Sequence, residues 1–190
     1  QSPSLFKPTR VPGTRKTDHD FMAIREIITY PHPVLRQQAA TITDFNQELK
    51  TLIEDMVDTM YQAPGVGLAA NQIGIARQVV VVDRSTQEGE RKFIALINPE
   101  ITNGEGSVVQ EEGCLSVVEC YAKVKRYHKI HVTAQDAEGN RLEFDAEDRF
   151  ARIIQHEVDH LLGTLFIDHL SPLKRALYKK KLKKMLKEKE

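Results

Sequence analysis

Apolar residues recur at helical spacing in two stretches of the chain. Spacings of three and four residues between residues 49 and 60 predict an amphipathic helix, and Pro64 and Gly65 end it. The pattern returns over residues 148–162 and stops at Gly163, a residue type that is common just past helix ends. The apolar positions of this second helix are Phe150, Ile153, Ile154, Val158 and Leu161.

Shorter apolar patterns between these helices predict a series of strands. The β-branched run over residues 79–82 and the alternation over residues 130–134 are the clearest. A turn at residues 137–140 separates the last two strands, and Pro31 and Pro33 introduce a short helix near residues 34–39. The predicted strands are residues 78–83, 92–98, 107–110, 122–126, 129–135 and 141–147.

The order of these elements predicts an α+β fold, because helices and strands are segregated instead of alternating as βαβ units. We expect mostly antiparallel strands packed around the helix at residues 148–162. Residues 22–170 then form one domain, and residues 171–190 form a basic C-terminal helix that starts at Ser171 and Pro172.

Residues 1–21 are polar and proline-rich without periodicity, and we expect a disordered or loosely attached extension. Met22 begins a more ordered pattern and could be the natural start. The residues before it would then be an expression remnant or the stub of a targeting segment. The stretch lacks the apolar core of a secretory signal. Its basic residues leave an organelle as the alternative to the cytoplasmic location that we expect.

Composition narrows the class of protein. The chain has 190 residues, of which 41% are hydrophobic and 28% charged, as in a globular domain with its own core. No apolar run approaches the ~20 residues that cross a bilayer, so we expect no membrane partner. Cys114 and Cys120 are too few for a disulfide framework and favour a reduced chain.

Charge is unevenly distributed although the formal net charge is zero. Residues 171–190 hold nine Lys/Arg and two Glu, a net +7, so the remaining residues sum to −7. The simplest interpretation is a solvated helix docked by its apolar side. The alternative is a surface for anionic partners such as ribosomal RNA, without sequence-specific recognition of nucleic acid. The apolar side comprises Leu173, Leu177, Tyr178, Leu182 and Leu186.

Candidate chemistry concentrates in residues 155–163, which contain the pattern H-E-x-x-H. Residues four apart share a helix face, so His156 and His160 can aim both imidazoles at one divalent metal. Glu157 lies about 100° around the helix and can stand beside the metal without ligating it. A water on such a metal is a usable nucleophile near neutral pH, and Glu157 can take its proton. The alternative is a helix that carries two unrelated histidines and binds no metal.

A catalytic zinc site usually has three protein ligands. Long metalloprotease patterns place the third histidine six residues after the second, where this chain has Phe166. Asp168 and His169 lie past the helix end and are weak candidates. Cys114 is stronger, because it follows a glycine near a strand end that could present its thiolate and the Leu115 N–H together. A lone cysteine is nevertheless more often a small core residue, and this ligand set suits Zn²⁺, Fe²⁺ or Ni²⁺.

A third stretch, residues 65–72, reads G-V-G-L-A-A-N-Q. Its small residues allow a ligand close to the backbone, but a tight loop entering a helix of small residues is the simpler interpretation. Phosphate binding is not indicated, because no P-loop lysine follows. Gln72 could donate an amide hydrogen bond of the kind found in oxyanion holes.

Together these stretches resemble the peptide deformylase family, whose motifs read G-x-G-x-A-A-x-Q, E-G-C-x-S and Q-H-E-x-D-H. They match residues 65–72, 112–116 and 155–160 in the same order. The resemblance covers residues 22 to the end.

The resemblance assigns a role to individual residues. It implies Cys114, His156 and His160 as metal ligands and Glu157 as the general acid/base. In the family, a glutamine and a backbone N–H form the oxyanion hole, here Gln72 and Leu115, and the first-motif loop binds the substrate backbone, here Val66 and Gly67.

The implied activity is removal of the N-formyl group from the initiator methionine of nascent polypeptides, by attack of metal-bound water. The implied cofactor is one divalent ion, Fe²⁺ in the cell, with Zn²⁺, Ni²⁺ or Co²⁺ as substitutes. The tail is similar to that of bacterial members whose long C-terminal helix docks on the ribosome. The expected partners are therefore N-formylmethionyl peptides and the ribosome.

The chain also departs from the family. Val118 and Tyr121 stand where many members have a proline and an arginine, with Cys120 between them. These departures and the basic tail motivate one alternative, a non-catalytic ribosome-associated module. A second alternative is a metallopeptidase that cleaves internal bonds, which H-E-x-x-H suggests and Phe166 disfavours.

Overall fold

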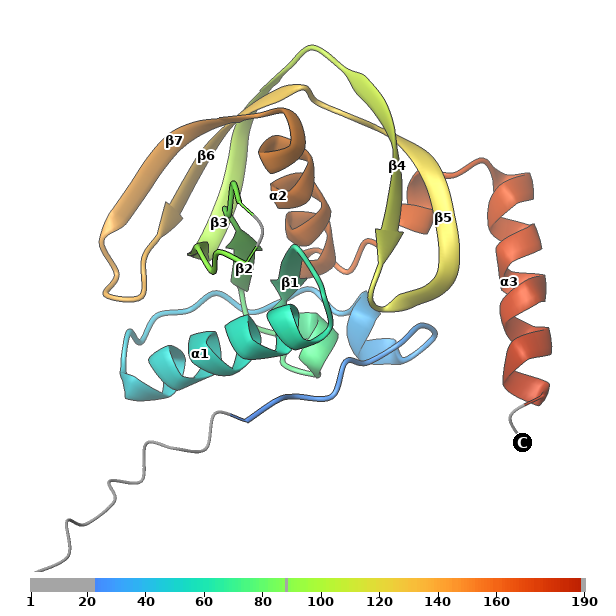
Figure 1. The fold of residues 1–190 in the computed structure, drawn as a ribbon, viewed down its shortest axis with the longest axis horizontal. Helices are drawn as coiled ribbons and strands as arrows, with labels where there is room; N and C mark the ends of the chain where they lie inside the picture. The colour runs from blue at the N-terminus through green and yellow to red at the C-terminus, as the bar shows by residue number, and fades with distance from the viewer. Residues whose placement is uncertain (1–22, 88, 189–190) are drawn as a thin grey trace, which may run out of the picture.

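The computed structural model describes residues 23–87 and 89–188, so the expected extension at residues 1–21 and the start at Met22 lie outside it. The described residues form an α+β fold with antiparallel strand pairs, as the sequence predicts (Figure 1). The helices are α1 (Gln47–Gln62), α2 (Asp148–Leu161) and α3 (Pro172–Lys187), with 3₁₀ helices η1 (Pro33–Arg36), η2 (Ala70–Ile73) and η3 (Phe166–His169). The strands are β1 (Gly67–Ala69), β2 (Val79–Asp83), β3 (Phe93–Glu105), β4 (Val108–Cys114), β5 (Val117–Arg126), β6 (Lys129–Gln135) and β7 (Arg141–Glu147).

Two sheets are present in the described part of the chain. Strands pair in the order β1-β2-β3-β6-β7 in the larger sheet, and β4 pairs with β5 in a separate hairpin. Helix α2 stands between this hairpin and the larger sheet, while α1 runs along the sheet's other face (Figure 1). Helix α2 is therefore the element that both sheets approach.

The valine run of β2 explains how one sheet covers both helices. Val80 and Val82 belong to the core that includes Ile154 and Leu161 of α2. The alternate residues Val79 and Val81 belong to the core on the α1 side. Because successive side chains of a strand point to opposite faces, an unbroken apolar run is what a strand buried on both sides requires.

Several strands are longer than the sequence predicts. The strand expected at residues 92–98 continues to Glu105, and that expected at residues 122–126 begins at Val117. The segment added to β3 is polar and follows shifts in register next to Asn98, whose φ is 50°, whereas the segment added to β5 is interrupted at Glu119, whose φ is 54°. The expected strand at residues 107–110 runs to Cys114. In the stretch expected to be a tight loop entering a helix, Gly67–Ala69 form β1 and Ala70–Ile73 form the 3₁₀ helix η2, so a strand replaces part of the loop.

Helix α3 does not dock by its whole apolar side. Tyr178 and Leu182 are buried in a third core cluster with the β4–β5 hairpin and η3. Leu173, Leu177 and Leu186 are 71%, 59% and 45% exposed, so the expectation that they join the docked side was wrong. Tyr178 and Leu182 are four residues apart and share a face, whereas Leu177 lies one position from Tyr178, about 100° around the helix. The Tyr178 hydroxyl also donates to the Val118 carbonyl at 3.2 Å.

Candidate metal centre

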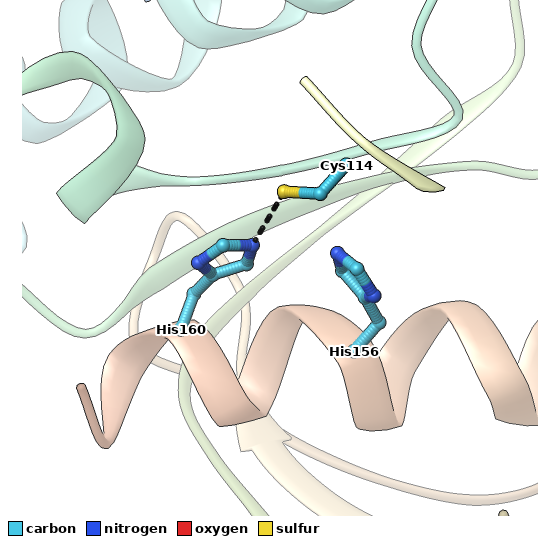
Figure 2. A group of neighbouring side chains, drawn as sticks. All are labelled: Cys114, His156 and His160. Carbon is cyan, nitrogen blue, oxygen red and sulfur yellow. Dashed lines mark hydrogen bonds between the residues drawn. The ribbon is translucent and has the colours of Figure 1, made fainter. Parts of the chain in front are cut away.

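Three side chains from two distant parts of the chain meet between α2 and the β4–β5 hairpin. His156 and His160 rise from one face of α2, and Cys114 reaches them from the end of β4 (Figure 2). One nitrogen or sulfur ligand atom of each lies within 4.8 Å of the others. The Cys114 Sγ is 3.3 Å from His160 Nε2.

The local sequence explains this convergence. Helix α2 buries Ile154 and Leu161 against the larger sheet, which fixes its rotation and turns His160 inward. The register of the β4–β5 pair shifts between Glu112 and Cys114. Such an irregularity bends a strand and re-aims the side chains beside it. The strand end therefore presents Cys114 to the helix.

A buried network of charged side chains holds the Nδ1 side of the His156 ring. Because a carboxylate can only accept, the His156 Nδ1–H donates to Glu112 Oε2, at 3.0 Å. The Arg126 guanidinium donates to both oxygens of Glu112, at 2.9 and 3.0 Å, and to Asp159 Oδ2, at 2.6 Å. Burial alone would raise the pKa of Glu112, but the hydrogen bonds from His156 and Arg126 lower it to about 2. The ionised carboxylate thus orients the His156 ring, with its Nε2 left for the cluster.

Burial is also the largest cause of the pKa shifts of His160 and Glu157 on α2. Burial lowers the pKa of His160 well below its usual value, which favours the neutral imidazole that metals bind. Burial raises the pKa of Glu157 to about 7. Its Oε2 has no hydrogen-bond partner among the described residues. Glu157 therefore has a carboxylate oxygen left for a ligand, water or ion.

A cleft of about 330 Å³ opens onto this group of side chains. Val66 and Gly67 line one side of it, and the end of β4 with Leu115 lines the other. Gln72 also lines it, with Nε2 3.6 Å from Cys114 Sγ and Oε1 accepting from the Ala69 N–H at 2.9 Å. All the site residues that the sequence predicted line this cleft except His160, which does not line it but contacts Cys114 Sγ through its Nε2 at 3.3 Å.

The weaker ligand candidates lie elsewhere. The Phe166 ring stacks on His156, with centroids 6.0 Å apart, and so fills the place of a third histidine with an apolar wall. Asp168 pairs with Arg36. His169 binds Asp159 Oδ2 at 2.8 Å, behind the cluster.

The residues present fit a divalent metal. A thiolate and two imidazoles are a donor set that first-row metals accept, and their ligand atoms converge on one point. The carboxylate partner of His156 is the outer hydrogen bond that metal-bound histidines usually make. Beside them, the buried Glu157 Oε2 has no hydrogen-bond partner among the described residues. Buried polar atoms of a purely structural core are normally hydrogen-bonded, so this oxygen also favours a ligand site.

Sequence reasoning missed the residues that support this group. The sequence patterns assign no role to Arg126, and none to Asp159 beyond its place in the third family motif, yet Arg126 is buried. A signal was available, because Val124 and Arg126 lie two apart on one strand and so share its inward face. Ser116, also buried, was read only as the last residue of a motif.

Val118 and Tyr121, the two departures from the family, both lie on β5, but only Tyr121 lines the cleft. Tyr121 lines the cleft and is 74% exposed. A Cβ added at Gly113 would meet the Tyr121 ring at 2.7 Å, so the ring packs directly over that glycine. An aromatic side chain therefore borders the cleft at this position.

Comparison with known proteins agrees with this geometry. The family model described as polypeptide deformylase matches residues 24–176. A peptide deformylase of Desulfotalea psychrophila is 55% identical over 164 residues, covering 86% of this chain and 97% of the relative. One from Syntrophobacter fumaroxidans is 48% identical over 167 residues, covering 88% and 98%.

Solved structures give the same result. The crystal structure of a peptide deformylase from Legionella pneumophila has a TM-score of 0.80 at 44% identity, covering 88% of this chain and 98% of that one. That of peptide deformylase 1B from Arabidopsis thaliana has a TM-score of 0.79 at 38% identity, covering 86% and 93%.

Proposed function

The chain belongs to the polypeptide deformylase family, a family of hydrolases that remove the N-formyl group from nascent peptides, and we propose that its Cys114–His156–His160 group holds the ion for this reaction. The convergence of these three ligand atoms beside an unpartnered Glu157 oxygen carries the proposal. When bound, a divalent ion in such a site lowers the pKa of water and polarises a carbonyl.

Glu157 is the proton carrier in this proposal. Its carboxylate stands beside the ligand group and takes a proton as water attacks the formyl carbon. The proton then passes to the nitrogen as the C–N bond breaks, which releases formate and a free methionyl amine. A pKa near neutrality suits a group that must both accept and donate within one cycle.

Gln72 and Leu115 supply the donors for the developing oxyanion. The Gln72 Nε2 faces the cluster from one side, and the Leu115 N–H follows Cys114 on the other. Fixed donors of this kind are effective because they need no reorientation during the reaction, and losing one typically costs ~2.7–4 kcal/mol.

Two free strand edges form the walls that hold the peptide. Strand β1 pairs only with β2, and β4 only with β5, among the described strands. An extended substrate can pair with backbone at Val66 and Gly67, in the manner of a strand added to a sheet edge. Ile153 adds an apolar surface beside the cluster for the methionine side chain.

Fe²⁺ is the proposed ion in the cell, with Zn²⁺, Ni²⁺ or Co²⁺ as substitutes, and the cytoplasm is the proposed location because nascent chains are the substrate. The proposed second partner is the ribosome, contacted through α3. The support is the +7 charge of residues 171–190.

The decisive experiment measures formate release from a formyl-Met peptide by iron- or nickel-loaded protein. We expect turnover that Glu157→Ala abolishes while metal content and fold persist. The same peptide without its formyl group should remain intact, which separates the activity from internal peptide cleavage. Turnover that survives Glu157→Ala would remove Glu157 from the mechanism.

A further inference from the structure

Hydrogen bonds hold the Gln72 carboxamide at both its oxygen and its nitrogen. Its Oε1 accepts from the Ala69 N–H at 2.9 Å, and its Nε2 donates to Ser116 Oγ at 3.1 Å. Gln72 and Ser116 are only 2% and 0% exposed, so water does not compete for these contacts. A carboxamide nitrogen carries two hydrogens. Ser116 accepts from one of them, and the other donates to Cys114 Sγ at 3.6 Å and so points to the ligand group.

Ser116 is itself fixed at every polar atom of its backbone. Its N–H donates to Cys114 Sγ at 3.4 Å, and its carbonyl accepts from the Tyr30 N–H at 2.8 Å. The Ile28 N–H donates to the Gln72 carbonyl at 2.7 Å. One short stretch of chain, residues 28–30, thus connects the backbones of Gln72 and Ser116. This connection fixes the backbones of the two residues relative to each other, in addition to the contacts that both make with Cys114 Sγ.

We propose that Ser116 is a positioning residue whose hydroxyl fixes the Gln72 carboxamide so that one N–H faces the reacting carbonyl oxygen. The proposal rests on the function proposed above, in which Gln72 stabilises the oxyanion. The terminal torsion of a glutamine has a broad minimum, so its direction must be set by partners. Without the hydroxyl, the carboxamide gains freedom and leaves a buried N–H without an acceptor.

A double-mutant cycle separates positioning from simple structural support. We expect Ser116→Ala to lower kcat by about 2- to 12-fold, the effect typical of losing one neutral hydrogen bond, with KM changed less than about twofold. In a Gln72→Leu background, Ser116→Ala should cause no further loss, because the residue it positions is gone. A loss of equal size in both backgrounds would overturn the proposal.

A second readout does not depend on turnover. In the zinc-loaded full chain, the two side-chain amide protons of Gln72 can be assigned by NMR, as the pair that Gln72→Leu removes. We expect Ser116→Ala to shift these resonances and to speed their exchange with solvent. Unchanged resonances would refute the positioning role, even if the enzyme were inactive in the formate assay. That outcome is distinct from failure of the proposed function, in which wild-type protein releases no formate.

Thr59→Val is the matched control for losing a buried hydroxyl. Thr59 Oγ1 is buried on α1, where it donates to the Asp55 carbonyl and accepts from the Arg25 N–H. This variant should lose stability without changing kcat or the Gln72 resonances. If Ser116→Ala does not fold, Ser116→Cys keeps the shape of the side chain with a weaker acceptor. The same cycle and resonances then apply.

Discussion

At the scale of single residues, Gly67 makes room for the Glu157 carboxylate. A Cβ placed at residue 67 would lie 2.5 Å from Glu157 Oε1 and 2.9 Å from Cδ. We therefore expect Gly67→Ala to push the carboxylate out of place and to lower kcat by at least about tenfold, since small misplacements of catalytic groups can cost about 100-fold. Steady-state formate release measures the effect.

Gly89→Ala is the control for this prediction. Gly89 has a φ of 80°, so alanine is strained there, but its Cβ would meet nothing within 4 Å. It should cost stability, about 1 kcal/mol, without lowering kcat. If Gly67→Ala retained full activity in a folded protein, Glu157 would have room to move and its precise placement would not matter.

Glu112 connects the metal group to the buried guanidinium of Arg126. Glu112→Gln keeps the shape of the side chain but removes the charge that accepts from His156 and Arg126. Loss of an outer partner of a metal-bound histidine typically lowers metal affinity ~10–100-fold, and we expect that range here. Zinc transfer to a chromogenic chelator measures it.

Glu111→Gln removes a neighbouring but exposed carboxylate and should leave zinc affinity unchanged. Equal affinities of Glu112→Gln and wild type would show that the ring of His156 is oriented by its packing against Phe166 instead.

Residue-scale prediction from the sequence succeeded where the geometry is local. The spacing of His156 and His160 defines a helix face without knowledge of the fold. Cys114 was a candidate from its place after a glycine near a strand end, and the resemblance then implied it as a ligand, but its approach depends on a strand irregularity that no periodicity encodes. The partnership of Glu112, Arg126 and Asp159 joins three elements, and nothing in the neighbourhood of any one residue in the sequence specifies the other two.

At the scale of elements, α3 is attached to the body through few buried side chains. Leu182→Ala removes one of them, at a typical cost of ~2–5 kcal/mol, which is comparable to the docking free energy of such a small contact. We expect α3 to undock while the two cores around α1 and α2 remain folded, because neither core includes a residue of α3. Hydrogen exchange should rise in residues 172–187 alone.

Leu177→Ala truncates an exposed leucine of the same helix and should not change exchange there. A cooperative loss of protection throughout the chain in Leu182→Ala would mean that α3 is integral to the fold.

The β6–β7 hairpin carries a pH-dependent contribution to stability. His131 donates to Asp145, which lies opposite it on β7, at 2.7 Å, and to Glu143 at 3.2 Å. These carboxylates raise the pKa of His131 above its usual 6.5, while the pKa values of both carboxyls are lowered. Lys129 also faces Asp145 from β6, and Asn103 lies opposite His131 on β3.

Because the folded state binds this proton more tightly, the stabilisation is full below the unfolded pKa and is lost as pH rises through the folded pKa. We expect His131→Asn to destabilise the protein at about pH 5.5 and to have little effect at about pH 9. Urea unfolding at the two pH values measures the difference. His128→Asn, at a second exposed histidine, is the control, and a pH-independent effect at residue 131 would contradict the assignment.

Strand positions were predictable, but strand lengths were not. The run of four valines in β2 identifies a strand buried on both faces, and the alternation in β6 identifies one face. The second half of β3 carries polar and charged residues because much of it is exposed. Strand β5 begins with apolar residues, but its pattern is interrupted at Glu119, whose φ is 54°. Burial on fewer sides weakens the pattern that sequence reasoning detects.

At the scale of the whole molecule, one helix serves both the core and the chemistry. The larger sheet packs on α2 from one side and sets its rotation, and the hairpin approaches from the other side and brings Cys114 (Figure 1). The proposed metal ligands therefore meet where the hairpin contacts α2, with Cys114 from the hairpin and the two histidines from the helix. Neither sheet alone contains the site, which explains why the motifs that encode it are dispersed over about half of the chain.

The C-terminal segment and the rest of the chain carry opposite net charge. Residues 171–190 carry +7 and the rest −7, so an anionic partner should attract α3 and repel the body. We expect the full chain to bind purified ribosomes with an affinity that falls steeply as salt rises, since contacts to phosphate release counterions. A triple variant with Lys180, Lys183 and Lys187 changed to Gln removes three exposed charges from α3 and should bind more weakly, with a shallower salt slope.

Changing Lys123, Lys125 and Lys92 to Gln removes the same charge from the body and should have a smaller effect, because those exposed lysines lie outside α3. Sedimentation with ribosomes at several salt concentrations measures both variants, and formate release from a short peptide should be the same for wild type and the α3 variant. Equal binding of the two triple variants would show that net charge, not α3, governs the association.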